Sequence, residues 1–76
     1  MTTINDLQII LGKNVKLRRE ARKWSQNILA EKIKVTKNAI CDIECGFKFV
    51  HGKTLVCLAN VFETEPYELL KPDSLW

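Results

Sequence analysis

The stretch WSQNILAEKIKVTKNAICDIECG, residues 24–46, decides how this chain folds. Ser25 and Thr36 each stand directly before a short run of helix-forming residues. A hydroxyl side chain at that place accepts a hydrogen bond from a free backbone amide of the first turn. The spacing therefore predicts one helix over residues 26–32 and a second over residues 37–45, joined by a tight turn.

Helices are also expected on both sides of this pair. Apolar residues at helical spacing predict a first helix from Asn5 or Asp6 to Lys23, with Asn5 as its cap, and a fourth helix over residues 53–62. Pro66 suits the first position of a fifth, shorter helix. No window alternates apolar and polar residues as a strand does, so we expect an all-α fold in which helices 2 and 3 form a helix-turn-helix.

Length and composition indicate one small globular domain. The chain has 76 residues, of which 46% are hydrophobic and 28% charged. We therefore expect a single domain over residues 1–76, with a core over residues 11–70 and a C-terminal tail over residues 71–76. A chain of this length buries only about 60% of its unfolded surface. It has little room for an enclosed active site, and we expect no enzyme activity.

The three cysteines, Cys41, Cys45 and Cys57, do not form a disulfide framework, because their number is odd and no secretory signal is visible. Reduced thiols and the lack of an apolar run near ~20 residues indicate a cytoplasmic protein with no membrane partner. Cys41 and Cys45 are four residues apart, but no Cys-x-x-Cys motif occurs, so no metal site is expected. Oxidation of Cys41 remains an alternative role for that thiol.

The charge of +3 is unevenly distributed along the chain. Residues 1–40 contain nine Lys and Arg against three Asp and Glu, whereas residues 41–76 contain three against six. A basic first half is typical of a surface that meets a polyanion. A solvated helix surface is the alternative interpretation of the same asymmetry.

The outward face of the second helix of the pair has side chains that suit the major groove of double-stranded DNA. Recognition helices place their N-terminal residues at base edges. Asn38 can form two hydrogen bonds with adenine, Lys37 can donate to guanine, and Asp42 can accept from cytosine. The expected base-reading residues are Lys37, Asn38, Cys41 and Asp42.

Phosphate contacts are expected at the starts of the two helices. Helix N-termini and nearby polar side chains bind phosphate oxygens. The Gln26 amide and the Thr36 hydroxyl can both donate there. On one helix alone, an ordinary solvated face would explain these residues; the paired caps and the basic first helix favour DNA.

Five motifs, in order and at fixed spacing, resemble the Cro and phage-repressor class of helix-turn-helix domains, also called the XRE family. They are LGKNVKLRR at residues 11–19, SQNILAEK at 25–32, ICDIECG at 40–46, TLVCLA at 54–59 and ELL at 68–70. The resemblance covers about four fifths of the chain. It implies a lambda-repressor-like fold of five helices and a homodimer that regulates transcription from a near-palindromic operator. It also implies an ion pair between Arg19 and Glu44.

The chain departs from the family pattern at several turns. Glycine is common at three helix ends where this chain has other residues: Lys23, Lys34 and Glu63. The usual Pro-Ser before helix four is Val50-His51, so that cap is in doubt. Phe47 and Phe49 replace polar loop residues, while Lys48 remains as an expected phosphate contact.

The C-terminal residues raise the question of a partner. Tyr67, Leu75 and Trp76 are expected at a dimer interface, although an aromatic chain end can also fold back onto its own core. No fused sensor domain, cofactor or small-molecule ligand is expected. The alternative function is a protein-interaction module, such as an antitoxin or adaptor, whose main partner is another protein; Phe47, Phe49 and Trp76 motivate it.

Overall fold

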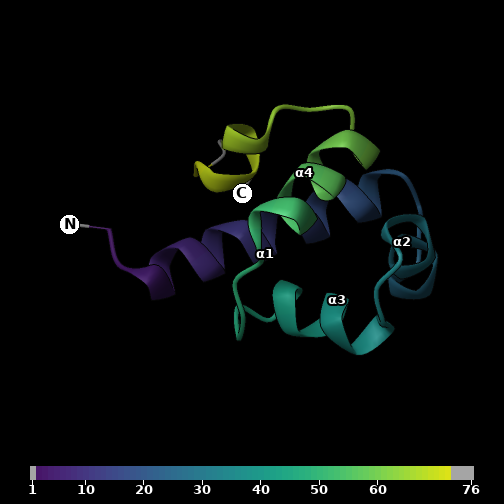
Figure 1. Cartoon of the computed structure of the whole chain (residues 1–76), viewed down its shortest axis with the longest axis horizontal. Coiled ribbons are helices and arrows are strands. Elements are labelled where there is room, and N and C mark those ends of the chain that lie inside the picture. Colours follow the sequence, from purple (N-terminus) through teal and green to yellow (C-terminus); the bar gives the residue numbers. More distant parts are fainter. Residues whose placement is uncertain (1, 73–76) are drawn as a thin grey trace.

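Four α-helices and one short 3₁₀ helix form the described part of the chain, which is residues 2–72 of the computed structural model (Figure 1). The elements are α1 (Ile4–Ala21), α2 (Gln26–Ile33), α3 (Lys37–Glu44), α4 (Gly52–Val61) and η1 (Pro66–Leu70). No strand occurs in residues 2–72, so the expected all-α class is confirmed. None of the described helices combines the length and the apolar character needed to cross a bilayer.

The helix-turn-helix forms where the two caps were expected. Ser25 accepts a hydrogen bond from the Ile28 amide at 3.1 Å, and Thr36 accepts one from the Ala39 amide at 3.1 Å. Gly46 follows α3 with a φ of 77°, the left-handed conformation that ends a helix. The predicted helices differ from α2 and α3 by only one residue at each C-terminus.

The first helix begins and ends earlier than expected. Thr3, and not Asn5, caps α1: its hydroxyl accepts from the Asp6 amide at 3.1 Å, and the Asp6 carboxylate accepts from the Thr3 amide at 3.0 Å. This reciprocal capping box satisfies two backbone donors and explains the earlier start. The helix ends at Ala21 because Lys23 adopts a φ of 58°.

The fifth predicted helix is a 3₁₀ helix and not an α-helix. Pro66 occupies its first turn as expected, but Glu65 provides no side-chain cap. The segment is five residues long and closes through bonds such as the one from the Glu68 amide to the Glu65 carbonyl, at 3.0 Å. Lys71 is extended because it precedes Pro72, which disfavours helical backbone at the residue before it.

The core lies between α1, which runs through the middle of the molecule, and the other four elements (Figure 1). Each element contributes fully buried side chains, among them Leu11, Val15, Leu29, Ile40, Leu58 and Leu69. Ile28 is exposed, although its neighbour Leu29 is fully buried. It lies in the first turn of α2, beside the Ser25 cap.

Asn14 ties the end of the described chain to α1. Its side-chain nitrogen donates to the carbonyls of Ile10, Leu69 and Lys71 at 3.0–3.1 Å, and its oxygen accepts from Arg18 at 3.0 Å. The side chain is fully buried, so these bonds replace its lost hydration. The amide thus links residues 55 and 57 positions apart in sequence.

The three predicted left-handed helix ends are present. Lys23, Lys34 and Glu63 have φ values of 58°, 60° and 55°. Each is followed by a residue whose amide donates back across the last turn: Trp24 to Arg19, Val35 to Ala30, and Thr64 to Ala59, at 2.9–3.2 Å. These bonds offset the cost of roughly 1 kcal/mol for a non-glycine residue in this conformation.

Candidate nucleic-acid interface

The inner side of α3 packs against α1 at Gly12. A Cβ atom at this position would lie 2.5 Å from the Ile43 carbonyl oxygen and 2.9 Å from that of Glu44. Both neighbours are backbone atoms, so they cannot move aside as a flexible side chain would. The close approach of α1 and α3 therefore requires glycine at this position.

A buried ion pair fixes the C-terminal end of α3. Arg19 donates to both carboxylate oxygens of Glu44, with Nε–Oε2 at 2.7 Å and Nη2–Oε1 at 3.0 Å. Its remaining nitrogen donates to the Trp24 carbonyl at 2.7 Å, in the turn before α2. The two side chains are only 11% and 4% exposed. One guanidinium therefore connects α1, the turn and α3.

The same carboxylate raises the pKa of Arg19 above its ordinary value. The main cause is the hydrogen bond with Glu44, which outweighs the opposite effect of burial, and the negative charges of Glu44 and Glu20 add to it. The guanidinium therefore stays charged at every physiological pH. Glu44 has a fixed cationic partner.

Gln26, the first residue of α2, shares this carboxylate. Its side-chain nitrogen donates to Glu44 Oε1 at 3.1 Å. This bond orients the half-buried amide and leaves its second hydrogen available to a ligand. The expected phosphate contact is therefore held by the same network that positions α3.

The outer face of α3 holds the four predicted base-reading residues. Lys37 and Asn38 are exposed in its first turn, while Cys41 and Asp42 are half-buried one turn later. Thr36 is also exposed; because its oxygen accepts from Ala39, its hydroxyl hydrogen remains free to donate.

Asp42 and Lys48 form a surface ion pair that sequence reasoning did not predict. Their nearest atoms are 3.4 Å apart, and the side chains are 34% and 69% exposed. A pair of this kind contributes under about 1 kcal/mol and opens readily. Lys48, which is expected to contact a phosphate, here partly neutralises Asp42, which is expected to contact a base. No sequence motif predicts the contact, because it depends on how the loop after α3 folds back.

Two thiols meet on α3. The sulfur atoms of Cys41 and Cys45 are 4.0 Å apart, and Cys45 is exposed. The contact with Cys41 is the main cause that raises the pKa of the Cys45 thiol, and the charges of Asp42 and Glu44 act in the same direction. Within residues 2–72 no group of three or more histidine, cysteine or acidic side chains is placed to hold a metal ion.

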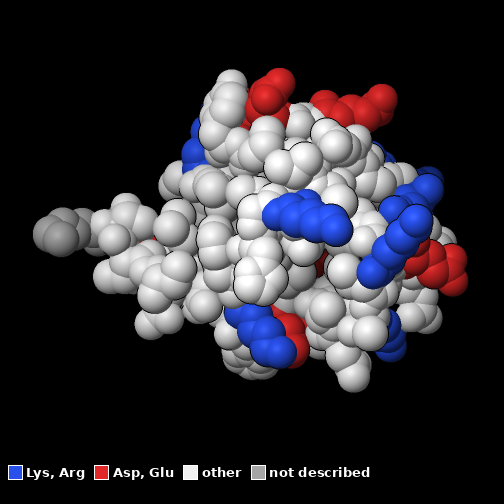
Figure 2. Space-filling model, in the orientation of Figure 1, with Lys and Arg blue, Asp and Glu red and all other residues white. Residues whose placement is uncertain are grey.

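Charge is unevenly distributed over the surface. Acidic side chains lie over α4 and η1 at the upper edge of the face in Figure 2, while the middle, right and lower parts of that face show lysine and arginine side chains together with further acidic ones. The acidic edge includes Glu63, Glu65 and Glu68, which line a shallow hollow. A polyanion would be repelled from this edge.

The expected dimer residues are only partly described. Tyr67 in η1 is exposed, with the Lys71 ammonium 5.9 Å from its ring centroid. Leu75 and Trp76 lie outside the described residues. Phe62 is buried in the core, so it is not part of an exposed aromatic end.

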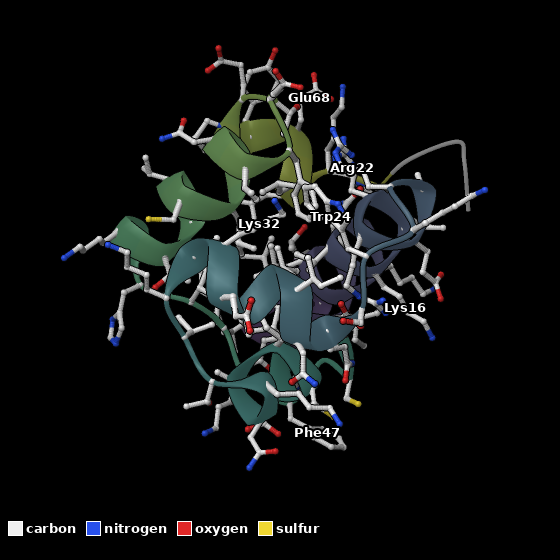
Figure 3. The ribbon with its side chains drawn as sticks, turned by 90° about the vertical axis from the view of Figure 1, so that its right-hand side faces the viewer. Lys16, Arg22, Trp24, Lys32, Phe47 and Glu68 are labelled. Atoms are coloured by element: carbon white, nitrogen blue, oxygen red, sulfur yellow. The ribbon has the colours of Figure 1, made fainter. Side chains whose placement is uncertain are left out.

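A cation–π cluster joins the turn before α2 to the end of α4 (Figure 3). The Arg22 guanidinium lies 5.6 Å from the Trp24 ring and 5.2 Å from the Phe62 ring, and the Lys32 ammonium lies 4.6 Å from Trp24. The two rings stack at 6.0 Å. Two basic residues of the first half of the chain therefore stabilise the fold, which charge counting alone did not show.

The loop between α3 and α4 leaves one aromatic side chain in solvent. Phe47 projects from the molecule beside α3 and is 73% exposed (Figure 3), while Phe49 packs partly against the core. His51 occupies the cap position of α4, which the sequence left in doubt, and forms no side-chain cap hydrogen bond.

Solved structures of transcription regulators share this fold. A hypothetical transcription factor from Neisseria is 23% identical, covers 99% of this chain and 86% of its own, and has a TM-score of 0.84. The restriction-modification controller protein C.AhdI of Aeromonas hydrophila is 26% identical over 82% of this chain and 94% of its own, with a TM-score of 0.76.

The P22 c2 repressor, solved in complex with a synthetic operator, is 28% identical over 83% of this chain and 96% of its own, with a TM-score of 0.78. No protein-family profile and no curated protein sequence matches the chain. The likeness therefore lies in the three-dimensional arrangement more than in the residues, and the resemblance read from the sequence motifs is confirmed by structure.

Proposed function

We propose that this chain, whose fold is that of the Cro and phage-repressor-type helix-turn-helix domains, regulates transcription by binding double-stranded DNA as a homodimer on a near-palindromic operator. The observation that carries the proposal is the contrast within α3. Its inner side is fixed by Gly12 and by the Arg19–Glu44 pair, whereas its outer side presents polar side chains to solvent. Two neighbours above 25% identity, C.AhdI and the P22 c2 repressor, support it.

The outer face of α3 reads bases in this proposal. Asn38 pairs with an adenine edge, Lys37 donates to guanine or to a phosphate, and Asp42 accepts from cytosine, with Cys41 against the groove beside them. Each bidentate contact contributes roughly 1–3 kcal/mol of discrimination. Asp42 can act in this way only after its weak pair with Lys48 opens.

The side chains at the N-terminal ends of α2 and α3 bind phosphates of one DNA strand in this proposal. The second amide hydrogen of Gln26 and the hydroxyl hydrogen of Thr36 donate to phosphate oxygens. Lys48, released from Asp42, supplies a cation to a neighbouring phosphate. The Glu44 bond fixes the Gln26 side chain before DNA arrives, which lowers the ordering cost of this contact.

A dimer would join two such faces at half-sites about one DNA turn apart. The exposed Tyr67 in η1 supports a contact at this end. The proposal also assigns Leu75 and Trp76, which lie outside the described residues, to the dimer interface. The acidic edge over α4 and η1 supports the orientation of α3 toward the groove, because this edge is then turned away from the phosphates.

Salt dependence of DNA binding tests the proposal. The affinity of the purified chain for random duplex DNA is measured by fluorescence anisotropy at several salt concentrations. We expect the logarithm of the association constant to fall linearly with the logarithm of salt, with a slope near −0.9 for each phosphate contact. Binding that is absent or independent of salt would contradict the proposal and favour a protein-interaction module that uses the exposed Phe47.

A further inference from the structure

The Cys41–Cys45 pair occupies one turn at the end of α3, on its outer side. The two sulfur atoms are 4.0 Å apart without a bond between them, and the structure holds both as free thiols. Cys57, the third cysteine, belongs to α4 and forms no hydrogen bond with this pair among the described side chains. The molecule therefore contains one dithiol and one separate thiol.

The separation of the two sulfur atoms suits one shared metal ion. Two sulfur ligands with metal bonds of about 2.3 Å lie ~4 Å apart at an angle of about 120°, and ~4.6 Å apart in the near-linear geometry of two-coordinate Cu(I). The observed separation of 4.0 Å is close to this range, and a small rotation of the exposed Cys45 side chain brings the pair to the linear distance. A disulfide would be harder to form, because it needs Cβ atoms about 3.5–4.5 Å apart, whereas residues four apart on a helix have theirs at about 5–6 Å.

The surroundings of the pair favour a cation. Cys45 caps the C-terminus of α3, where the helix dipole is negative. Soft thiolate ligands select soft cations such as Cu(I), which does not need the four-ligand cage of structural zinc.

We propose that Cys41 and Cys45 together bind one Cu(I) ion, and that the bound ion releases the protein from DNA. The second part rests on the proposed function; the first does not. Binding replaces two S–H protons by one monovalent cation, so the face of α3 becomes more negative by one charge. This change repels phosphates, and the ion occupies the space that Cys41 would need against a base.

The site is tested first without DNA. Cu(I) is supplied anaerobically as its bicinchoninate complex, and its transfer to the protein is followed by the loss of the complex's absorbance. We expect one Cu(I) per chain for the wild type and for Cys57→Ser. Because chelation by two linked ligands typically adds a factor of 10²–10⁴, Cys41→Ser and Cys45→Ser should each bind at least about 100-fold more weakly.

The control variant Cys57→Ser shows whether Cu(I) binding is specific to the Cys41–Cys45 pair. Equal affinity of Cys45→Ser and wild type would overturn the site, as would a loss of binding in Cys57→Ser comparable to that in Cys45→Ser. Circular dichroism confirms that each variant keeps its helices. Every variant is a single substitution in the full chain, so the result does not depend on whether a shorter fragment can fold.

The regulatory step is tested with duplex DNA at the same buffered Cu(I) level. We expect one equivalent of Cu(I) to weaken DNA binding at least about 10-fold for wild type and Cys57→Ser, and to leave Cys45→Ser unchanged. Cu(I) binding without any effect on DNA affinity would overturn the regulatory step while the site stands. Absence of DNA binding in every variant before Cu(I) is added would instead contradict the proposed function.

Discussion

The two sides of α3 differ in almost every physical respect. On the inner side, Gly12 admits two backbone carbonyls at close range, and Glu44 accepts three hydrogen bonds in a site that is 4% exposed. On the outer side, Lys37 and Asn38 are exposed, and Asp42 has a loose surface partner. The comparison shows that one helix of eight residues can be fixed on one side while its other side stays adaptable.

The difference implies that the two sides of α3 have separate roles, the inner side in folding and the outer side in DNA binding. Changes on the inner side should alter the stability of the fold, and through it the position of the helix. Changes on the outer side should leave stability almost unaltered and affect only DNA binding. Four substitutions, taken from the largest expected effect to the smallest, either break this division or define it more closely.

The largest effect is expected for Glu44→Ala. The substitution leaves the buried Arg19 guanidinium without its counter-charge, and removal of one partner of a buried pair costs about 3–5 kcal/mol. The free energy of unfolding, measured by urea denaturation, should fall by that amount. A small domain has only about 0.05–0.15 kcal/mol of stability per residue, so partial unfolding at 37 °C is expected.

A double-mutant cycle gives the control for this prediction. Arg19→Leu combined with Glu44→Leu should destabilise the fold by less than the sum of the single changes, because neither partner is left charged alone. Additive losses would show that the pair is no more than a surface contact, and the division between the two sides of α3 would not hold.

Gly12→Ala should rank second. The new Cβ would overlap the Ile43 and Glu44 carbonyl oxygens, so α1 and α3 must separate, at a cost of about 2–3 kcal/mol. Gly52→Ala is the matched control, because a Cβ there meets nothing within 4 Å. It should stabilise the fold by up to about 0.5 kcal/mol. Thermal unfolding of the two variants distinguishes them; equal effects would show that α1 and α3 do not need the close approach.

On the outer side, Asn38→Ala should change binding and not folding. We expect unfolding free energy within about 0.5 kcal/mol of wild type and a loss of roughly 1–3 kcal/mol of discrimination at one base pair. Selection of sites from a random DNA pool measures the second quantity. Gln26→Ala should instead weaken binding to all sequences similarly. Unchanged preference in Asn38→Ala would remove this residue from the base-reading set.

The smallest effect is expected at the turn between the two helices. Lys34 has a φ of 60°, so Lys34→Gly relieves the strain of a left-handed side chain but adds entropy to the unfolded chain. A net gain of about 0.5 kcal/mol is expected. Glu31→Gly, inside α2, should lose about 1 kcal/mol. A loss in both variants would mean that Lys34 stabilises the turn through its side chain.

Much of the fold could be predicted from the sequence because its signals are local. The hydroxyl caps Ser25 and Thr36 act within one turn of chain, and each was found where expected. The predicted start of α1 at Asn5 or Asp6 was wrong, because the capping box of Thr3 and Asp6 begins the helix before the expected Asn5 cap.

What could not be predicted depends on contacts between distant segments. The Asp42–Lys48 pair and the Arg22 contact with Phe62 require knowledge of how the loop and α4 return to the rest of the fold. The bonds of Asn14 to η1 had no local signal either, since asparagine within a helix is most often a surface residue. The 3₁₀ geometry of η1 could not be predicted either. It depends on the packing of Leu69 in the core as well as on the flanking Pro66 and Pro72.

The Asn14 amide also sets where the folding unit ends. Its two acceptors in the last described segment are the carbonyls of Leu69 and Lys71, and Leu69 itself is fully buried. A truncation before Leu69 would remove two of the three acceptors of this buried amide and open a void beside α1. We therefore expect a stable fragment to extend through Lys71, because η1, although short and irregular, closes the core against α1.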